Sequence, residues 1–166
     1  MKPRFRRLRA DDDLSGFDCG VGSLNTWIGN HAKFNEQAGL SRTRLLVNQH
    51  GNIMGYQSLS AGGIPKEHLP KKYVHRYPGY PIPILLLGRL AVDQKCKGNG
   101  YGRALMMDAL NETCKATDHV GATALIVDAL DDAKDFYVTQ FGFLETENNP
   151  SHLWLPLSTI RSLVKT

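Results

Sequence analysis

Apolar residues recur along the chain with two spacings, and these predict alternating helices and strands. Spacings of three and four residues predict helices over 21–39 and 101–116, and Gly39 is a stop signal for the first. Continuous apolar runs at 84–92 and 123–129 have the length and composition of buried strands. The chain therefore mixes both element types.

Weaker patterns complete the predicted order. They comprise an edge strand at 4–8, antiparallel strands at 42–49 and 51–62 around a turn at His50, a short helix over 131–140 capped by Asp131 or Asp132, a closing strand pair at 142–146 and 152–157, and a terminal helix over 158–165. Segment 62–83, rich in proline and tyrosine, predicts a long loop with at most a helical turn. We expect one mixed α/β domain over residues 1–166.

Composition narrows the class of protein. The 166 residues are 42% hydrophobic and 22% charged, as in soluble globular domains. No apolar run approaches the roughly 18 residues that a membrane helix needs, and no apolar stretch follows the basic N-terminus. Three cysteines without a CxxC pair indicate reduced thiols, and the six histidines are scattered, so we expect no metal site and a cytoplasmic location.

A glycine-rich loop is the main chemical signal. Gly98, Gly100 and Gly102 lie between a predicted buried strand and a predicted helix. Glycines let the backbone approach an anion, and a helix N-terminus offers free N–H groups, so the loop suits a pyrophosphate, with Lys97 and Arg103 adding charge. A plain strand-to-helix turn is the alternative. The spacing fits neither GxxxxGK[ST] nor GxGxxG, which argues against a P-loop and against NAD.

The loop resembles the acetyl-CoA loop of the GNAT superfamily of N-acetyltransferases. That loop is written Gln/Arg-x-x-Gly-x-Gly/Ala, and "KGNGYG" (97–102) follows it with lysine in first place. "LGRLAVD" (87–93) and "DFYVTQFGF" (135–143) match the elements on either side. The resemblance implies a GNAT fold, with a mixed central sheet of about six to seven strands and flanking helices. It also implies acetyl-CoA binding by Leu90, Ala91, Val92, Lys97, Gly98, Asn99, Gly100, Tyr101, Gly102 and Arg103.

One branch of that superfamily is more similar still, the acetyltransferase toxins of type II toxin–antitoxin pairs. The matching stretches are "FDCGVGSLNTWI" (17–28), "NEQAGLSRTRLLV" (35–47), "GYQSLSAG" (55–62), "PIPILLLGRLAVD" (81–93) and "NNPSHLWLPL" (148–157). This resemblance implies acetylation of the α-amino group of aminoacyl-tRNA, which blocks translation. It further implies a small DNA-binding antitoxin, repression of the shared operon by the complex, and a homodimer.

Three features depart from the expected pattern, the first being Lys97 in place of glutamine or arginine. Segment "VDALDDAKDFY" (127–137) is one residue shorter than usual, so either Leu130 or Asp131 faces the CoA. Asp128 stands where a histidine is common.

The resemblance makes Tyr137 the acid that protonates the CoA thiolate. A phenol has a pKa of about 10 and is therefore protonated at neutral pH. The alternative is a core aromatic among Phe136, Phe141 and Phe143. An α-amine with a pKa of about 8 or below needs no strong base, although Glu36 or a water is a candidate.

Basic residues beside aromatic ones are candidates for contact with tRNA. In the 62–83 loop, Tyr73, Tyr77 and Tyr80 interleave with cations and offer stacking surfaces, or they pack within the loop itself. Arg89 has an internal ion pair as its alternative role, and Trp27 and Trp154 are expected in the core. The tRNA-binding candidates are Arg42, Lys71, Lys72, Arg76 and Arg89.

Two rival functions remain open at this stage. A GNAT enzyme could acetylate another amine, such as a protein N-terminus, a polyamine or a drug. A non-catalytic module could keep the CoA loop as a ligand site, although the presence of Tyr137 argues against it.

Overall fold

The computed structural model describes residues 2–147 and 149–165, and its described strands form one seven-stranded mixed sheet. The strand order is β1-β2-β3-β4-β5-β7-β6. The strands are β1 (Arg4–Arg7), β2 (Arg42–Val47), β3 (Ile53–Ile64), β4 (Ile82–Val92), β5 (Ala124–Asp128), β6 (Leu144–Thr146) and β7 (Asn149–Pro156). The pair β4–β5 is parallel, while β1–β2, β2–β3, β5–β7 and β6–β7 are antiparallel. The expected mixed sheet with flanking helices is therefore confirmed.

The helices are α1 (Gly22–Asn30), α2 (Ala32–Ala38), α3 (Lys71–Val74), α4 (Tyr101–Thr117), α5 (Lys134–Phe141) and α6 (Leu157–Lys165). The chain divides into two compact units. Unit 1 contains residues 2–60 and 88–109, and unit 2 contains residues 61–87 and 110–165. Three elements, β3, β4 and α4, continue from one unit into the other.

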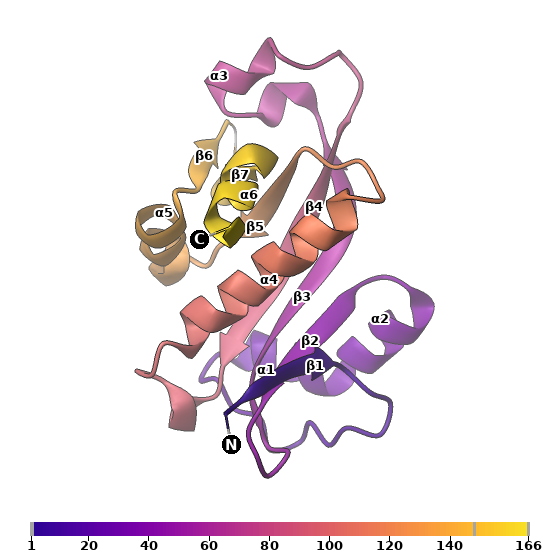
Figure 1. Ribbon diagram of the computed structural model, residues 1–166, viewed down its shortest axis with the longest axis vertical. Coiled ribbons are helices and arrows are strands. Elements are labelled where there is room, and N and C mark those ends of the chain that lie inside the picture. Colours follow the sequence, from indigo (N-terminus) through magenta and orange to yellow (C-terminus); the bar gives the residue numbers. More distant parts are fainter. Residues whose placement is uncertain (1, 148, 166) are drawn as a thin grey trace. The chain divides into compact units, whose positions relative to one another are not determined.

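In unit 1, α1 and α2 lie beside β1 and β2 (Figure 1). Alternate residues of β2 face two different apolar clusters, as the two-residue period of a strand requires. Leu45 and Val47 join Trp27, Tyr56 and other residues in one cluster, whereas Leu46 packs with Met54 and Leu105 in the other.

Unit 2 contains β5, β6 and β7 with α5 and α6 packed against them (Figure 1). Its core gathers Trp154 and Ile126 from the sheet with Leu69 and Tyr73 from the segment before β4. Segment 62–83, predicted as a loop with at most a helical turn, holds the end of β3, a 3-10 turn and the single turn α3.

The prediction of one helix over 21–39 is wrong, because the helix divides at His31. His31 has φ −124° and ψ −28°, outside α-helical geometry, although Gly39 ends the second part in the left-handed conformation as expected. In α2, Ala32 is buried in the core, whereas Phe34 is 67% exposed.

The prediction that Asp131 or Asp132 caps a helix over 131–140 is also wrong. A 3-10 turn occupies Asp131–Ala133, and α5 begins at Lys134 with no side-chain cap at Ala133. The Ala133 N–H bonds to the Leu130 carbonyl, so the turn itself leads the chain into the helix. In the matched stretch 148–157, Asn148 lies outside the described residues.

Candidate acetyl-transfer site

The glycine loop of unit 1 connects β4 to the N-terminus of α4. Gly98 has φ +84° and Gly100 has φ +80°, in the left-handed region that L side chains avoid. A Cβ on either residue would meet no atom within 4 Å. Glycine is therefore required by the backbone conformation and not by close packing. The open space above the loop fits a ligand that lies on its backbone.

The loop is held from the protein side by three polar side chains. Lys97 Nζ donates to the Cys19 carbonyl at 2.8 Å, and Asn99 Nδ2 donates to the Cys96 carbonyl at 3.0 Å. The Asp93 carboxylate accepts from the Lys95 N–H at 2.9 Å. Asp93 was not among the predicted site residues, although an aspartate directly after a buried strand is a recognisable turn cap.

The first turn of α4 contains Tyr101, Gly102 and Arg103, and it carries no acidic residue. The Ala104 N–H bonds to the Gly100 carbonyl at 3.1 Å, which starts the helical pattern. In general the first N–H groups of an α-helix lack partners within the helix, and the dipole of a 17-residue helix adds positive potential at this end. This end of α4 suits a phosphate group.

Leu90–Val92, the last residues of β4, precede the loop in unit 1. Leu90 and Val92 pack in the cluster that includes Leu105 of α4, and Ala91 faces the cluster that includes Trp27. The parallel ladder with β5 covers Leu85–Leu87 and, among the described residues, no later position of β4. The backbone edge of Leu90–Val92 is therefore not taken up by β5.

Tyr137 lies in unit 2 on α5, with a packed ring and an available hydroxyl. It is 6% exposed, and its ring makes edge contacts with Phe136 at 5.2 Å and Phe143 at 5.6 Å. Within the described residues, its hydroxyl has no hydrogen-bond partner, yet it is not among the buried unpaired polar atoms. Burial raises the pKa of Tyr137 to about 12. The residue thus fits both interpretations, as a core ring and as a neutral proton donor.

Leu130 and Asp131 follow β5 in unit 2, separated from its end by Ala129. Both are exposed, and Leu130 is extended, with φ −64° and ψ 149°. Asp128 lies 4.0 Å from His152. That either Leu130 or Asp131 faces CoA stays a prediction.

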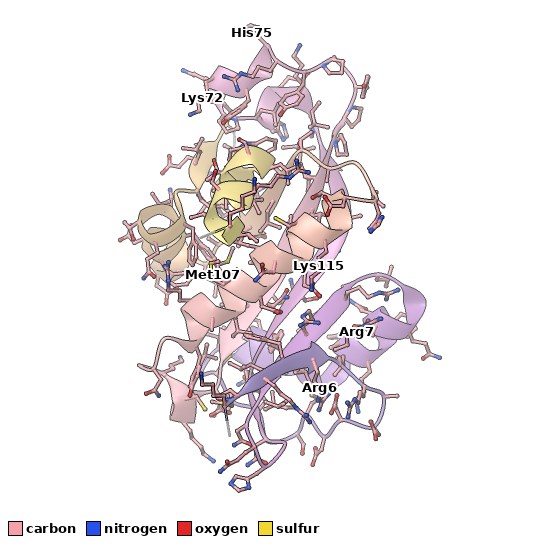
Figure 2. The ribbon with its side chains drawn as sticks, in the orientation of Figure 1. Arg6, Arg7, Lys72, His75, Met107 and Lys115 are labelled. Atoms are coloured by element: carbon pink, nitrogen blue, oxygen red, sulfur yellow. The ribbon has the colours of Figure 1, made fainter. Side chains whose placement is uncertain are left out.

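The basic candidates in unit 2 cluster at α3. Lys72 Nζ lies 5.4 Å and Arg76 Cζ 4.9 Å from the centre of the Tyr73 ring, which packs on Trp154 at 5.8 Å. Lys71 is exposed, and Figure 2 shows Lys72 and His75 at this segment. Tyr73 therefore acts as a buried platform under two cations rather than as a free stacking surface.

The other two candidates lie in unit 1. Arg42 donates to the Glu36 carbonyl at 2.8 Å, and its guanidinium lies 3.5 Å from the Glu36 carboxylate. Glu36 also accepts from Arg7 at 2.9 Å and from the Thr43 N–H at 2.8 Å. With these three partners Glu36 is a structural carboxylate, which leaves it poorly suited to act as a base.

Arg89 lies over the Trp27 ring, with Cζ 5.2 Å from the ring centre. Its Nη1 donates to the Gly88 carbonyl at 2.8 Å. The alternative of an internal ion pair is wrong for the described residues, because none of their ion pairs includes Arg89. Both tryptophans are buried, as predicted.

Among the residues that the structure describes, no group of three or more His, Cys, Asp and Glu side chains could hold a metal ion. No helix in that part of the chain is both long enough and apolar enough to span a membrane.

Comparison with known proteins adds independent information. The model of the acetyltransferase (GNAT) domain family matches residues 85–159. A tRNA-acetylating toxin from Mycobacterium tuberculosis is 34% identical over 160 residues, which make up 96% of this chain and 95% of that toxin.

Two solved structures are similar over almost the whole chain. AtaT complexed with acetyl-methionyl-tRNAfMet has a TM-score of 0.87 at 28% identity and covers 98% of this chain and 99% of that one. A mutant AtaT toxin bound to the C-terminus of the antitoxin AtaR and acetyl-CoA has a TM-score of 0.82 at 26% identity, with 99% of each chain covered.

Proposed function

The chain belongs to the GNAT acetyltransferases, among the tRNA-acetylating toxins, and we propose that it transfers the acetyl group of acetyl-CoA to the α-amino group of an aminoacyl-tRNA. The observation that carries the proposal is the 34% identity to a tRNA-acetylating toxin over nearly all of both chains. The glycine loop and Tyr137 supply local support.

The acetyl donor fits the open backbone of the loop. Gly98–Arg103 would hold the pyrophosphate, because this stretch combines two left-handed glycines with the N-terminus of α4. The free backbone edge of Leu90–Val92 would pair with the extended arm of the donor, and an N–H there would polarise the acetyl carbonyl. Acetyl-CoA supplies the reactive thioester. Lys97, bonded to Cys19, keeps the loop in shape as well as adding charge.

Tyr137 would donate its hydroxyl proton to the departing sulfur. The raised pKa keeps the phenol neutral across the physiological range, so the proton is present in the resting enzyme. The packed ring fixes the hydroxyl position through contacts with Phe136 and Phe143. We also propose that residues 1–166 act as one domain.

The acceptor requires little base catalysis. An α-amine with a pKa of about 8 is partly neutral at physiological pH, whereas a lysine amine at about 10.4 is almost fully protonated. Glu36 is engaged by Arg7, Arg42 and the Thr43 N–H. These facts favour an α-amine as the acceptor.

The biological consequences follow from family membership. Acetylation of charged tRNA stops its use in translation, so the protein acts as a toxin that an antitoxin neutralises. AtaT, a similar protein, binds the C-terminus of its antitoxin AtaR. We propose a comparable DNA-binding antitoxin, a repressor complex, a homodimer and a cytoplasmic location for this chain. Arg42, Lys71, Lys72 and Arg76 remain candidates for tRNA phosphates.

The test is acetyl transfer from radiolabelled acetyl-CoA to total charged and uncharged tRNA, with the wild type and Tyr137→Phe. We expect label on charged tRNA only, and a loss of at least about 100-fold in the variant, as for a general acid. Thermal unfolding of the variant is the control, because phenylalanine keeps the ring packing. Bound acetyl-CoA with no label on any tRNA would redirect the search to protein or small-molecule amines.

A further inference from the structure

Three side chains from separate segments of unit 1 form a layered group beside the proposed acetyl site. Arg89 lies over the Trp27 ring, and Trp27 stacks on Tyr56 with ring centres 5.8 Å apart and an angle of 16°. The Tyr56 hydroxyl donates to the Leu24 carbonyl at 2.8 Å, which fixes the base of the stack to α1. The guanidinium is therefore held in one place by aromatic packing.

The charge of Arg89 is not balanced within the part of the chain that the structure describes. Its contacts there are the Gly88 carbonyl and the Trp27 ring, and no carboxylate pairs with it. The residue is only partly exposed. A partly buried guanidinium normally pairs with an anion, because its five donors are costly to leave unsatisfied. An arginine fixed in this way is suited to an anion that arrives with a substrate.

Its position on β4 identifies which substrate. Arg89 directly precedes Leu90–Val92, and it shares a strand face with Ala91, which packs in the same cluster as Trp27 and Tyr56. At about 3.3 Å per strand residue, Arg89 lies within roughly 10 Å of the backbone proposed to hold the thioester. An anion bound there would belong to the acceptor, close to the amine that is acetylated.

The chemistry of the acceptor then selects the anion. A guanidinium with one face on an aromatic ring presents its donors at its edge, a geometry that matches two phosphate oxygens. In an aminoacyl-tRNA the anion nearest the α-amine is the phosphate that joins the terminal adenosine to the preceding nucleotide. We propose that Arg89 binds this last internucleotide phosphate, with Trp27 as the positioning residue. The inference rests on the proposed function and adds a specific subsite to it.

Two ribonucleases convert one pool of charged tRNA into substrates with and without this phosphate. Ribonuclease T1 cleaves after guanosines and leaves 3′ fragments that keep the last phosphate. Ribonuclease A cleaves after pyrimidines and releases aminoacyl-adenosine without it. Initial rates of acetylation are measured on both digests and on intact charged tRNA, for the wild type, Arg89→Gln and Arg161→Gln. Arg161 lies on α6 beside Asp118, outside the site, so Arg161→Gln is a control that removes the same charge elsewhere.

We expect Arg89→Gln to lower kcat/KM by roughly 10- to 100-fold on intact tRNA and on the ribonuclease T1 fragments, mainly through KM, as for a lost charged hydrogen bond. On aminoacyl-adenosine the variant and the wild type should be equal. Arg161→Gln should match the wild type on all three substrates. An equal loss on aminoacyl-adenosine, or no loss on intact tRNA, would overturn the assignment.

Trp27 variants test the positioning role separately. Trp27→Leu should raise KM several-fold on the phosphate-bearing substrates only, and Trp27→Phe, which keeps an aromatic face, should restore most of the affinity. Acetyl-CoA binding and the unfolding temperature control for a folding defect. If the wild type labels no charged tRNA, the proposed function fails and this subsite fails with it. If the wild type labels tRNA but Arg89→Gln does so equally well, only the subsite is wrong.

Discussion

Tyr137 shows how burial sets the chemistry of a single residue. Desolvation raises its pKa to about 12, which means that the neutral, donating form persists until the pH approaches that value. The α-amine acceptor behaves in the opposite way, because it reacts only after losing its proton near pH 8. We predict that kcat/KM on charged tRNA rises from pH 6 to about pH 8.5 and shows no tyrosine-dependent fall up to about pH 10.

Short initial-rate measurements across this range, corrected for hydrolysis of the aminoacyl ester, test the profile. Since the folded pKa lies above the usual tyrosine value, a basic limb with a midpoint below about pH 9.5 that disappears in Tyr137→Phe would contradict a raised pKa for this residue.

Gly100 illustrates a backbone requirement at the same scale. Its φ of +80° is unfavourable for an L side chain by about 1–2 kcal/mol, although a methyl group there would meet no protein atom. We predict that Gly100→Ala weakens acetyl-CoA binding about 5- to 10-fold, measured by calorimetry. Gly29→Ala is the matched control in the exposed last turn of α1, where a methyl group would meet no atom, and it should leave acetyl-CoA binding unchanged while stabilising the fold by at most about 1 kcal/mol. If Gly100→Ala bound acetyl-CoA as tightly as the wild type, the loop would tolerate another backbone conformation at this position.

At the scale of elements, periodicity predicted most helices and strands but not where they break. The apolar runs of β4 and β5 and the apolar spacing in α4 were sufficient to predict these three elements, because their burial determines their composition. The division at His31 could not be predicted from periodicity, since the apolar pattern continues through this residue. The predicted cap of α5 by Asp131 or Asp132 was wrong because both residues lie in a 3-10 turn that leads into the helix.

A buried polar link connects α4 to two strands within unit 1. Asp108 of α4 is 9% exposed, and its carboxylate accepts from Arg44 of β2 at 2.8 and 3.1 Å and from Gln57 of β3 at 3.1 Å. We predict that Asp108→Ala lowers the free energy of unfolding by about 2–3 kcal/mol, because it removes charged hydrogen bonds from the half-buried Arg44 guanidinium and from the buried Gln57 amide.

Urea unfolding measures this change. The control is Asp118→Ala, which removes an exposed carboxylate 3.9 Å from Arg161 and should change stability by less than about 1 kcal/mol. If the two variants lost similar free energies of unfolding, the hydrogen bonds of Asp108 would contribute no more to stability than a surface ion pair.

At the scale of the whole molecule, the candidate site residues are distant from one another in the sequence. The sequence identified the glycine loop and Tyr137, because short motifs carry them. It could not pair Arg89 with Trp27, 62 positions apart by residue number, because that contact depends on how α1 packs against β4. Trp27 was correctly predicted in the core, but its contact with the Arg89 guanidinium could be identified only from the structure.

The division into two units raises the question of whether they unfold together. Because β3, β4 and α4 continue through both, loss of one unit would interrupt two strands and a helix of the other. We therefore predict a single cooperative transition. Each unit contains one tryptophan, so Trp154→Phe leaves Trp27 to report unit 1, and Trp27→Phe leaves Trp154 to report unit 2. In each variant, urea midpoints from fluorescence and from far-ultraviolet circular dichroism should coincide. Comparison within one variant removes the effect of the substitution itself on stability. A fluorescence midpoint separated from the circular dichroism midpoint in either variant would show that the units unfold independently, and the single-domain proposal would then be wrong.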